Sequence, residues 1–324
     1  MKRNLIKMEI KPVPLHYFTS ADFVWLHWYE NIKHKFLFPL IIRFIEKSIN
    51  KGQKIIWNVH NKKPHINRNQ VESIYLMKLL AKVSHKIVIH SHISTEIVKE
   101  LCDSDETVLN KIIYVPHPHY IDIYGEQAKN ISLDNNTLKL CFLGAVKNYK
   151  NVDLLISAVR ELNTKAIHLS IYGESSSKKY AEYLSDLIGS NKNIKLNLRF
   201  ISDKQIPEIL TNHHLIVLPY NLDSTLNSGS NILAFSYGRT VLSPVTGTLS
   251  DIENDSMYFS YHYSDQLSHK EEIKRQILEI FDKYKGNYND LLKMGESCKQ
   301  YVAENHSSEQ VITQLNKVFT YERG

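Results

Sequence analysis

Short apolar runs alternate along the chain with segments whose apolar positions recur every three or four residues. Runs rich in Val, Ile and Leu are typical of buried parallel strands, and the longer segments between them have the period of amphipathic helices. In the first part of the chain, strands are predicted at 23–28, 54–60, 86–91 and 111–117, with helices at 36–50, 70–83 and 95–102 between them. Strands that alternate with helices indicate βαβ units and a parallel sheet.

The alternation stops in a polar, turn-rich stretch at 124–137 and then begins again. Strands are predicted at 138–144, 167–173, 194–200, 214–220 and 239–244, helices at 152–162, 179–188, 206–211 and 231–237, and mostly helix from Glu271 onward. Two successive α/β units indicate two Rossmann-like, doubly wound domains with a cleft between them. We expect an N-terminal domain at 1–130, a second domain at 131–305, and a C-terminal helix at 306–324 that packs back on the first domain.

Composition agrees with a globular protein of two domains. The chain has 324 residues, of which 43% are hydrophobic and 23% charged, and these values exclude wholesale disorder. Its cysteines, Cys102, Cys141 and Cys298, have no metal-binding or redox spacing, and the first residues lack the apolar core of a secretory signal. The longest apolar run, at 36–45, is much shorter than the roughly 20 residues of a transmembrane helix. A cytoplasmic protein is therefore expected.

The net charge of +6 is concentrated in the first part of the chain. Residues 1–130 contain 19 Lys and Arg against 12 Asp and Glu, whereas the remainder contains 21 against 22. Such a bias favours an anionic partner, and no nucleic-acid-binding motif is present. The segment 32–54 surrounds apolar residues with basic ones, as in a peripheral helix at an anionic membrane surface on the inner face. A buried crossover helix with a solvated cationic edge is the alternative interpretation.

The turn after the predicted strand at 138–144 has residues suited to a diphosphate. Gly144 allows close approach of the backbone to a ligand, and Lys147 and Lys150 place two cations just ahead of a helix. A helix N-terminus carries roughly half a positive charge and exposed N–H groups, so phosphate is a favoured ligand there. Two ammonium groups would stabilise the charge on a departing nucleoside diphosphate. The spacing is not that of a P-loop, and a solvated lysine loop is the alternative.

A second candidate turn begins at Tyr220 and leads into a helix. Ser228 is a predicted N-cap, and the small residues Gly229 and Ser230 open the helix and leave N–H groups accessible. An ordinary capped helix would show the same pattern. The strand that ends at Gly173 is suited to one wall of a nucleotide site.

Six segments follow one another along the chain: LHWYENI (26–32), WNVHNKKPH (57–65), IVIHSHIS (87–94), VPHPHY (115–120), FLGAVKNYKN (142–151) and SGSNILAFSYGRTV (228–241). In this order they resemble segments of retaining nucleotide-sugar glycosyltransferases with the GT-B fold, of the glycosyl transferases group 1 type. The resemblance implies an α/β GT-B fold and transfer of a hexosyl group from a UDP- or GDP-linked sugar. The implied acceptor is a glycan or a lipid-linked sugar, as in surface polysaccharide synthesis.

The resemblance also implies roles for individual residues. Lys150 matches a characteristic lysine of the family, Lys147 stands where many members have arginine, and His60 matches a first-domain histidine that faces the donor sugar. These three residues are the predicted catalytic residues. The predicted donor-binding residues are Gly144, Gly173, Tyr220, Ser228, Gly229, Ser230 and Asn231. No metal or other cofactor is expected, because the two lysines and the helix dipole would neutralise the diphosphate.

Two positions depart from the family pattern. Many members have two glutamates eight residues apart, and this chain has Thr225 and Leu233 there, neither of which can accept hydrogen bonds as a carboxylate does. One interpretation is a branch that uses the Ser-Gly-Ser turn instead. The other is a catalytically idle protein that binds a sugar nucleotide or supports a partner enzyme.

Histidines are concentrated before residue 120, where ten of the 16 lie. His90 and His92 form an HxH pair, as do His117 and His119, and a strand places both rings of such a pair on one face. A zinc site would use such pairs together with carboxylates, but the sequence has no HExxH motif. Hydrogen-bonded or stacked histidines at strand ends are the favoured interpretation.

Overall fold

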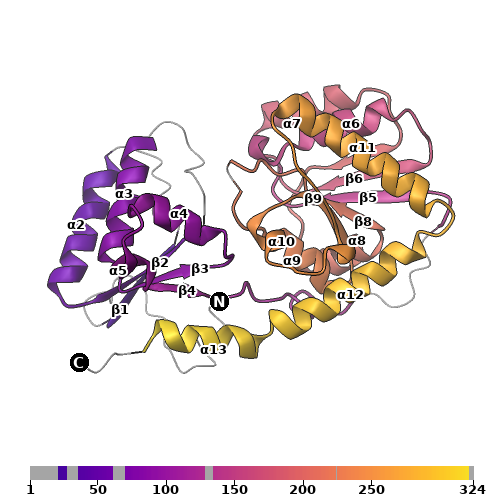
Figure 1. Cartoon of the computed structure of the whole chain (residues 1–324). Helices are drawn as coiled ribbons and strands as arrows, with labels where there is room; N and C mark the ends of the chain where they lie inside the picture. The colour runs from indigo at the N-terminus through magenta and orange to yellow at the C-terminus, as the bar shows by residue number, and fades with distance from the viewer. Residues whose placement is uncertain (1–20, 28–35, 61–69, 128–133, 224, 321–324) are drawn as a thin grey trace. The chain divides into compact units, whose positions relative to one another are not determined.

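The chain divides into two compact units in a computed structural model that describes residues 21–27, 36–60, 70–127, 134–223 and 225–320 (Figure 1). Unit 1 comprises Met1–Pro118, Asp223–Asn227 and His306–Gly324, and unit 2 comprises His119–Leu222 and Ser228–Asn305. No helix within the described ranges is long and apolar enough to cross a membrane.

Unit 1 is built on a parallel sheet with the strand order β1-β2-β3-β4. The strands are β1 (Phe23–His27), β2 (Lys54–Asn58), β3 (Lys86–Ile89) and β4 (Ile112–Tyr114). The connections contain α2 (Leu37–Asn50), α3 (Gln70–Val83), α4 (Ser94–Leu101) and α5 (Glu106–Leu109). Each connection moves to the next strand in the same direction, so right-handed crossovers bring these helices to one face of the sheet.

The other face of this sheet is covered by α13 (Ser308–Val318), from the end of the chain (Figure 1). Adjacent residues of β2 reach the two sides, as the period of a strand requires: Trp57 belongs to the core beneath α2 and α3, and Ile56 to the core beneath α13. The second core consists of Ile56, Val88, Val115, Val311, Leu315 and Val318. The C-terminal segment from His306 therefore groups with unit 1.

Unit 2 has a six-stranded parallel sheet with the order β10-β9-β8-β5-β6-β7. The strands are β5 (Leu138–Leu143), β6 (Ile167–Tyr172), β7 (Ile194–Asn197), β8 (Leu215–Val217), β9 (Thr240–Pro244) and β10 (Phe259–Tyr261). The chain runs outward from β5 to β7, returns to β8 on the other side of β5, and then runs outward to β10. The order reverses between β5 and β8, and ligands of doubly wound sheets bind at the carboxyl ends of the strands at such a reversal.

Helices cover both faces of the unit 2 sheet (Figure 1). One face carries α6 (Val152–Glu161), α7 (Lys178–Ile188) and α11 (Gln266–Tyr284), and the other carries α8 (Ile206–Thr211), α9 (Gly229–Ser236), α10 (Gly247–Ser250) and α12 (Asn289–Asn305). One continuous apolar core runs through the unit. Where α12 packs close to α9, a Cβ atom on Gly295 would clash with the carbonyl group of Gly238.

The division between the units falls at Pro118, earlier than the predicted boundary at residue 130. The segment after Pro118 groups with unit 2 because its backbone bonds there: the Tyr120 amide donates to Ser236 Oγ at 2.9 Å, and the Tyr124 amide donates to the Tyr237 hydroxyl at 3.1 Å. The rest of the predicted linker, at 128–133, lies outside the described residues. The sequence did not predict β10. It also placed the start of the helical region at Glu271, whereas α11 begins at Gln266, directly after Asp265, which forms a capping box with Ser268.

Candidate functional site

Two glycines at adjacent strand ends shape the reversal point of the unit 2 sheet. Gly144 follows β5 and Gly173 follows β6, with φ angles of 150° and 140°. The Gly144 amide donates to the Tyr172 carbonyl at 3.0 Å. A Cβ atom on Gly173 would clash with the Gly144 carbonyl, whereas one on Gly144 would meet nothing within 4 Å. Close contact between two backbones therefore requires glycine at 173, and the φ angle favours it at 144.

The turn after β5 that carries Lys147 and Lys150, here called the lysine turn, contains a single turn of 3-10 helix, η3 (Asn148–Lys150). One residue, Asn151, separates η3 from α6. Lys147 precedes η3 in extended backbone and its side chain is exposed, while that of Lys150 is half-buried. Asn151 joins η3 to α6 with a left-handed φ of 52°, a conformation that asparagine tolerates better than most residues. The turn thus presents one ammonium group to solvent and holds the other against the protein.

The turn after β8 comes into contact with the lysine turn. Tyr220 is buried, and the Lys150 Nζ atom lies 3.9 Å from the centroid of its ring, which is a cation–π contact. The Asn221 amide also donates to the Tyr149 carbonyl at 3.4 Å. The structure therefore brings together two predicted site residues from the two strands between which the strand order reverses.

The N-terminus of α9 separates the predicted donor-binding residues into two groups. Ser228 caps the helix, because its Oγ accepts from the Asn231 amide at 3.2 Å. Asn231 is fully buried, and its Nδ2 donates to Thr246 Oγ1 at 3.3 Å. Gly229 and Ser230 are half-buried, and the first amides of a helix lack intrahelical acceptors. Gly229 and Ser230 thus offer backbone N–H groups to an anion, whereas Ser228 and Asn231 shape the turn.

The segment from β10 into α11 contacts both turns, and the sequence interpretation missed it. The Tyr263 hydroxyl donates to the Tyr220 carbonyl at 3.1 Å and accepts from the Leu222 amide at 2.8 Å. The His269 Nδ1 atom accepts from Asn151 Nδ2 at 3.4 Å. The sequence around Tyr263, SYHYSD (260–265), matches no motif. Its aromatic residues just before a helix N-cap were the signal that could have drawn attention to it.

His60 lies in a cluster of imidazoles at the carboxyl ends of the unit 1 strands. Its Nε2 is 3.0 Å from His27 Nδ1 and 3.0 Å from Asn58 Nδ2. Asn58 Nδ2 also lies 3.1 Å from His90 Nε2, and His90 Nδ1 donates to the Val115 carbonyl at 2.7 Å. Because a carbonyl can only accept, the proton of neutral His90 lies on Nδ1, and its Nε2 accepts from the Asn58 amide.

Burial lowers the pKa of each histidine in this cluster. The pKa falls to about 4 for His27, about 2 for His60 and about 3 for His117, chiefly through desolvation and then through the nearby His90. Burial lowers the pKa of His90 as well. At neutral pH the His60 ring is therefore uncharged, so it can form hydrogen bonds with a hydroxyl group but cannot act as an imidazolium acid.

The two HxH pairs are divided between different surroundings. His90 and His117 face one another with ring centroids 6.2 Å apart, whereas His92 stacks on Tyr114 at 4.5 Å. The His119 Nδ1 atom accepts from a backbone amide at 3.2 Å. In the described part of the chain, no group of three or more His, Cys, Asp or Glu side chains is arranged to hold a metal ion. The expectation of hydrogen-bonded and stacked histidines at strand ends is confirmed.

The two positions that depart from the glutamate pattern lie in different surroundings. Thr225 is buried in the short segment Asp223–Asn227, which groups with unit 1. Leu233 is half-buried in α9 and packs against the unit 2 core. An apolar contact thus takes the place of a carboxylate on α9.

The fold is that of the GT-B glycosyltransferases, as the resemblance implies. Anabaena HepE in complex with UDP-glucose superposes with a TM-score of 0.71 over 98% of this chain and 88% of that chain, at 11% identity. The glycosyltransferase from Rickettsia africae ESF-5 gives a TM-score of 0.66 over 98% of this chain and 86% of that chain, at 14% identity. At these identities the likeness concerns the fold alone.

Residues 125–229 match the family glycosyl transferases group 1, in agreement with the family resemblance found in the sequence. The chain is also 23% identical over 193 residues to the GDP-mannose:glycolipid 4-beta-D-mannosyltransferase of Xanthomonas campestris pv. campestris. That match covers 60% of this chain and 50% of the relative, so the chain spans about half the length of the curated relatives it matches.

Proposed function

We propose that the protein is a glycosyltransferase that moves a hexosyl group from a nucleotide sugar to a hydroxyl group of a glycan or lipid-linked acceptor. The bond between the anomeric carbon and the diphosphate oxygen breaks, a bond to the acceptor oxygen forms, and the acceptor proton is released with the nucleoside diphosphate. The observation that carries this proposal is the cation–π contact between Lys150 and Tyr220, where the strand order of unit 2 reverses. The Lys150 Nζ atom lies 3.9 Å from the centroid of the Tyr220 ring.

The electrostatics of this region favour departure of a diphosphate. Lys150 is held in place and Lys147, three residues earlier, is exposed, so two ammonium groups are available from one turn. The first amides of α9 add the positive end of a helix dipole. Together these groups can neutralise the charge that a divalent cation would otherwise balance, so the proposal includes catalysis without a metal.

The donor nucleotide is UDP or GDP in this proposal. The similar HepE was crystallised with UDP-glucose, and the similar Xanthomonas protein is described as using GDP-mannose. Retention of the anomeric configuration and a role in surface polysaccharide synthesis belong to the proposal through the resemblance to retaining GT-B enzymes. For His60 we propose hydrogen bonding to a substrate hydroxyl as a neutral imidazole, in keeping with its pKa of about 2.

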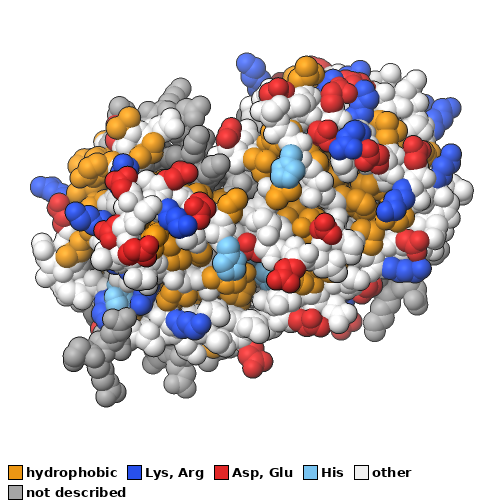
Figure 2. Space-filling view, in the orientation of Figure 1, with side chains coloured by type: hydrophobic (Ala, Val, Ile, Leu, Met, Phe, Trp, Pro, Cys, Tyr) orange, Lys and Arg blue, Asp and Glu red, His pale blue; other side chains and the backbone are white. Residues whose placement is uncertain are grey.

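Unit 1 has a surface suited to an anionic membrane, the other partner in this proposal. α2 packs on the sheet through Ile45. Three apolar side chains are nevertheless exposed: Phe36 at the N-cap of α2 (68%), Leu40 on α2 (56%) and Val71 on α3 (79%). A groove of about 500 Å³ between these helices is lined by Phe38, Pro39, Ile42, Arg43, Val71, Glu72 and Tyr75. Hydrophobic side chains gather over α2 and α3 in Figure 2. Apolar side chains beside the basic residues of α2 favour peripheral binding to anionic lipid.

A donor screen with one variant and one control tests the catalytic proposal. Wild-type protein is incubated with UDP- and GDP-linked hexoses, with and without EDTA, and release of the nucleoside diphosphate is measured. We expect turnover with at least one donor in EDTA, a loss of about 100-fold or more in Lys150→Ala, and no loss in Lys165→Ala, whose lysine is exposed elsewhere in unit 2. Full activity in Lys150→Ala would overturn the assignment. Binding of UDP or GDP without turnover of any donor would favour the idle, sugar-nucleotide-binding alternative.

A further inference from the structure

Tyr263, between the end of β10 and the start of α11, bridges the turn that follows β8. Its hydroxyl oxygen contacts the Tyr220 carbonyl at 3.1 Å and the Leu222 amide at 2.8 Å. A single oxygen atom thus satisfies one acceptor and one donor on either side of Asn221. These two bonds fix the backbone that carries the Tyr220 ring.

His269 connects the same segment to the lysine turn. Its ring stacks on that of Tyr263, with 3.8 Å between centroids and 2° between planes. Nδ1 accepts from Asn151 Nδ2 at 3.4 Å, and because an amide nitrogen only donates, the ring proton lies on Nε2, which faces the Tyr261 hydroxyl at 2.9 Å. Burial lowers the pKa of His269 to about 4, so the ring keeps this neutral form. Asn151 directly follows Lys150. The His269 imidazole therefore fixes the residue at which the lysine turn ends and α6 begins.

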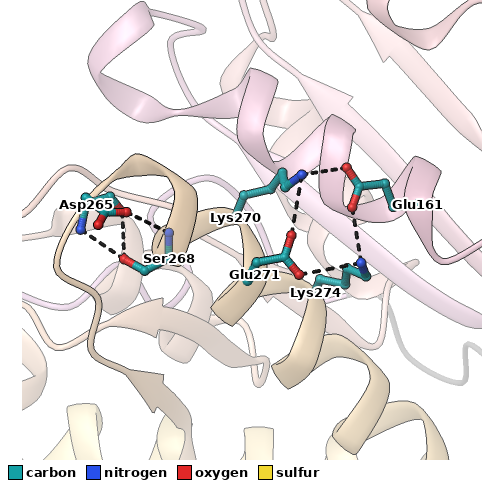
Figure 3. A network of polar contacts seen from close by, with 6 residues as sticks. All are labelled: Glu161, Asp265, Ser268, Lys270, Glu271 and Lys274. Atoms are coloured by element: carbon teal, nitrogen blue, oxygen red, sulfur yellow. Dashed lines mark hydrogen bonds and ion pairs between the residues drawn. The ribbon is translucent and has the colours of Figure 1, made fainter.

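The first turn of α11, which carries His269, is fixed at its start by a capping box (Figure 3). The Asp265 carboxylate accepts from the Ser268 amide at 2.8 Å, and Ser268 Oγ accepts from the Asp265 amide at 2.9 Å. Each side chain satisfies a backbone N–H group of the other residue, which would otherwise lack a partner at the helix end. The position of the helix start is therefore well defined.

Ion pairs then join this part of α11 to α6 (Figure 3). Lys270 and Lys274 approach opposite oxygens of Glu161 at 2.6 and 3.1 Å, and Glu271 approaches both lysines at 3.4 and 3.5 Å. A single exposed pair stabilises little, whereas four alternating charges on two helices form a network that favours one relative position of the helices. Along the chain, His269 lies between the capping box and the paired lysines. Both sets of contacts therefore restrict the position of its ring with respect to α6 and the lysine turn.

These contacts form a closed ring from Lys150 to Tyr220, Tyr263, His269, Asn151 and back to Lys150. We propose that Tyr263 and His269 are positioning residues that hold the Lys150 ammonium over Tyr220, where it meets the departing diphosphate. The identity of that ligand rests on the proposed function, whereas the position of the ammonium group does not.

The position of Lys150 can be measured without any substrate. Lysines are reductively methylated with ¹³C-formaldehyde, and the Lys150 methyl signal is assigned by its loss in Lys150→Ala. An ammonium 3.9 Å from a ring centroid gives an upfield-shifted signal. We expect Tyr263→Phe and His269→Phe, which keep an aromatic ring but lose the bonds to the two turns, to move this signal toward that of the exposed Lys147. Tyr258→Phe is the control, because its hydroxyl bonds the Leu249 carbonyl at 3.0 Å, apart from both turns.

Unchanged Lys150 signals in both folded variants would overturn the proposal, as would the same change in Tyr258→Phe. Where the wild type turns over a donor, misplacement of Lys150 should lower kcat about tenfold in Tyr263→Phe and raise KM by a smaller factor, because the ammonium group is still present but is no longer well oriented. A wild-type kcat in that variant also overturns the positioning role. If the wild type turns over no donor, the proposed function fails, and the methyl signal still decides whether Tyr263 and His269 position Lys150.

Discussion

The backbone of Gly173 lies directly against the carbonyl group of Gly144, where two neighbouring parallel strands of unit 2 end. We expect Gly173→Ala to destabilise the protein strongly, because the added methyl group forces the two strand ends apart. Gly286→Ala is the matched control: its φ is 80°, but nothing lies within 4 Å of the added atom, so only the backbone cost of about 1–2 kcal/mol applies. Urea unfolding followed by circular dichroism gives both free energies, and equal losses would refute the argument from close contact.

The two lysines of the turn before α6 should differ in how they bind a nucleoside diphosphate. Lys150 is half-buried and held by Tyr220, whereas the Lys147 side chain is exposed. We expect Lys147→Ala to weaken binding of UDP or GDP modestly and only at low ionic strength, because salt screens exposed charges. Lys150→Ala should weaken binding more, and at high salt as well. Calorimetric titration at two salt concentrations tests this, and equal salt dependence in the two variants would contradict it.

The exposed apolar surface of α2 predicts binding to anionic vesicles. We expect wild-type protein to float with vesicles that contain phosphatidylglycerol at low salt, and Leu40→Glu to lose this binding because a carboxylate replaces an apolar contact. Leu267→Glu is the matched control, since Leu267 is 69% exposed on α11, against 56% for Leu40 on α2. Absence of wild-type binding at low salt, or equal loss in both variants, would exclude this surface as the membrane contact.

The neutral histidine cluster of unit 1 predicts loss of stability in acid. The folded-state pKa values of about 4, 2 and 3 for His27, His60 and His117 lie below the ordinary value of 6.5. The unfolded chain therefore binds more protons below about pH 6.5, and the free energy of unfolding falls as the pH is lowered from there toward the folded values. At about pH 5 the loss is about 2 kcal/mol for each fully depressed group.

The slope of stability against pH isolates this effect from other consequences of substitution. We expect His60→Gln to reduce the slope between about pH 4 and pH 6.5, and to reduce it more than His168→Gln, a matched substitution at an exposed histidine of unit 2. An unaltered slope in His60→Gln would show that the imidazole at 60 is not kept neutral by the fold. Buried histidines of unit 2 with lowered pKa values, His213, His214 and His269, add a contribution of the same sign to both variants.

Local patterns predicted most of the helices and strands, because the period of apolar residues directly reflects which face is buried. The strand at 167–173 and the helix at 152–162 differ from β6 and α6 by one residue, and the N-cap Ser228 was found from its side chain alone. The approach of Lys150 to Tyr220 could not be predicted in this way. It depends on the strand order, which is set by the direction of successive crossovers and not by any one segment.

The charge of His60 also could not be predicted from the sequence. Its position at the end of a buried strand was predicted. Its pKa of about 2, however, results first from burial and then from three other histidines brought together from separate strand ends. Tyr263 and His269 show the same limit, since their rings stack with 3.8 Å between centroids and no motif in the sequence marks this contact. The protonation state and the partners of these side chains thus depend on contacts between distant segments, which residue types alone do not predict.

The return of α13 to the unit 1 sheet has a consequence for synthesis of the protein. On the ribosome, Ile56, Val88 and Val115 emerge long before Val311 and Leu315, with which they form one core. Until then the nascent chain has an apolar sheet face that its own final helix does not yet cover, and such faces bind chaperones or associate with other chains. Unit 1 begins to emerge first, but its second core forms only after α13 has been synthesised. Unit 2 can therefore fold before unit 1 has its full core.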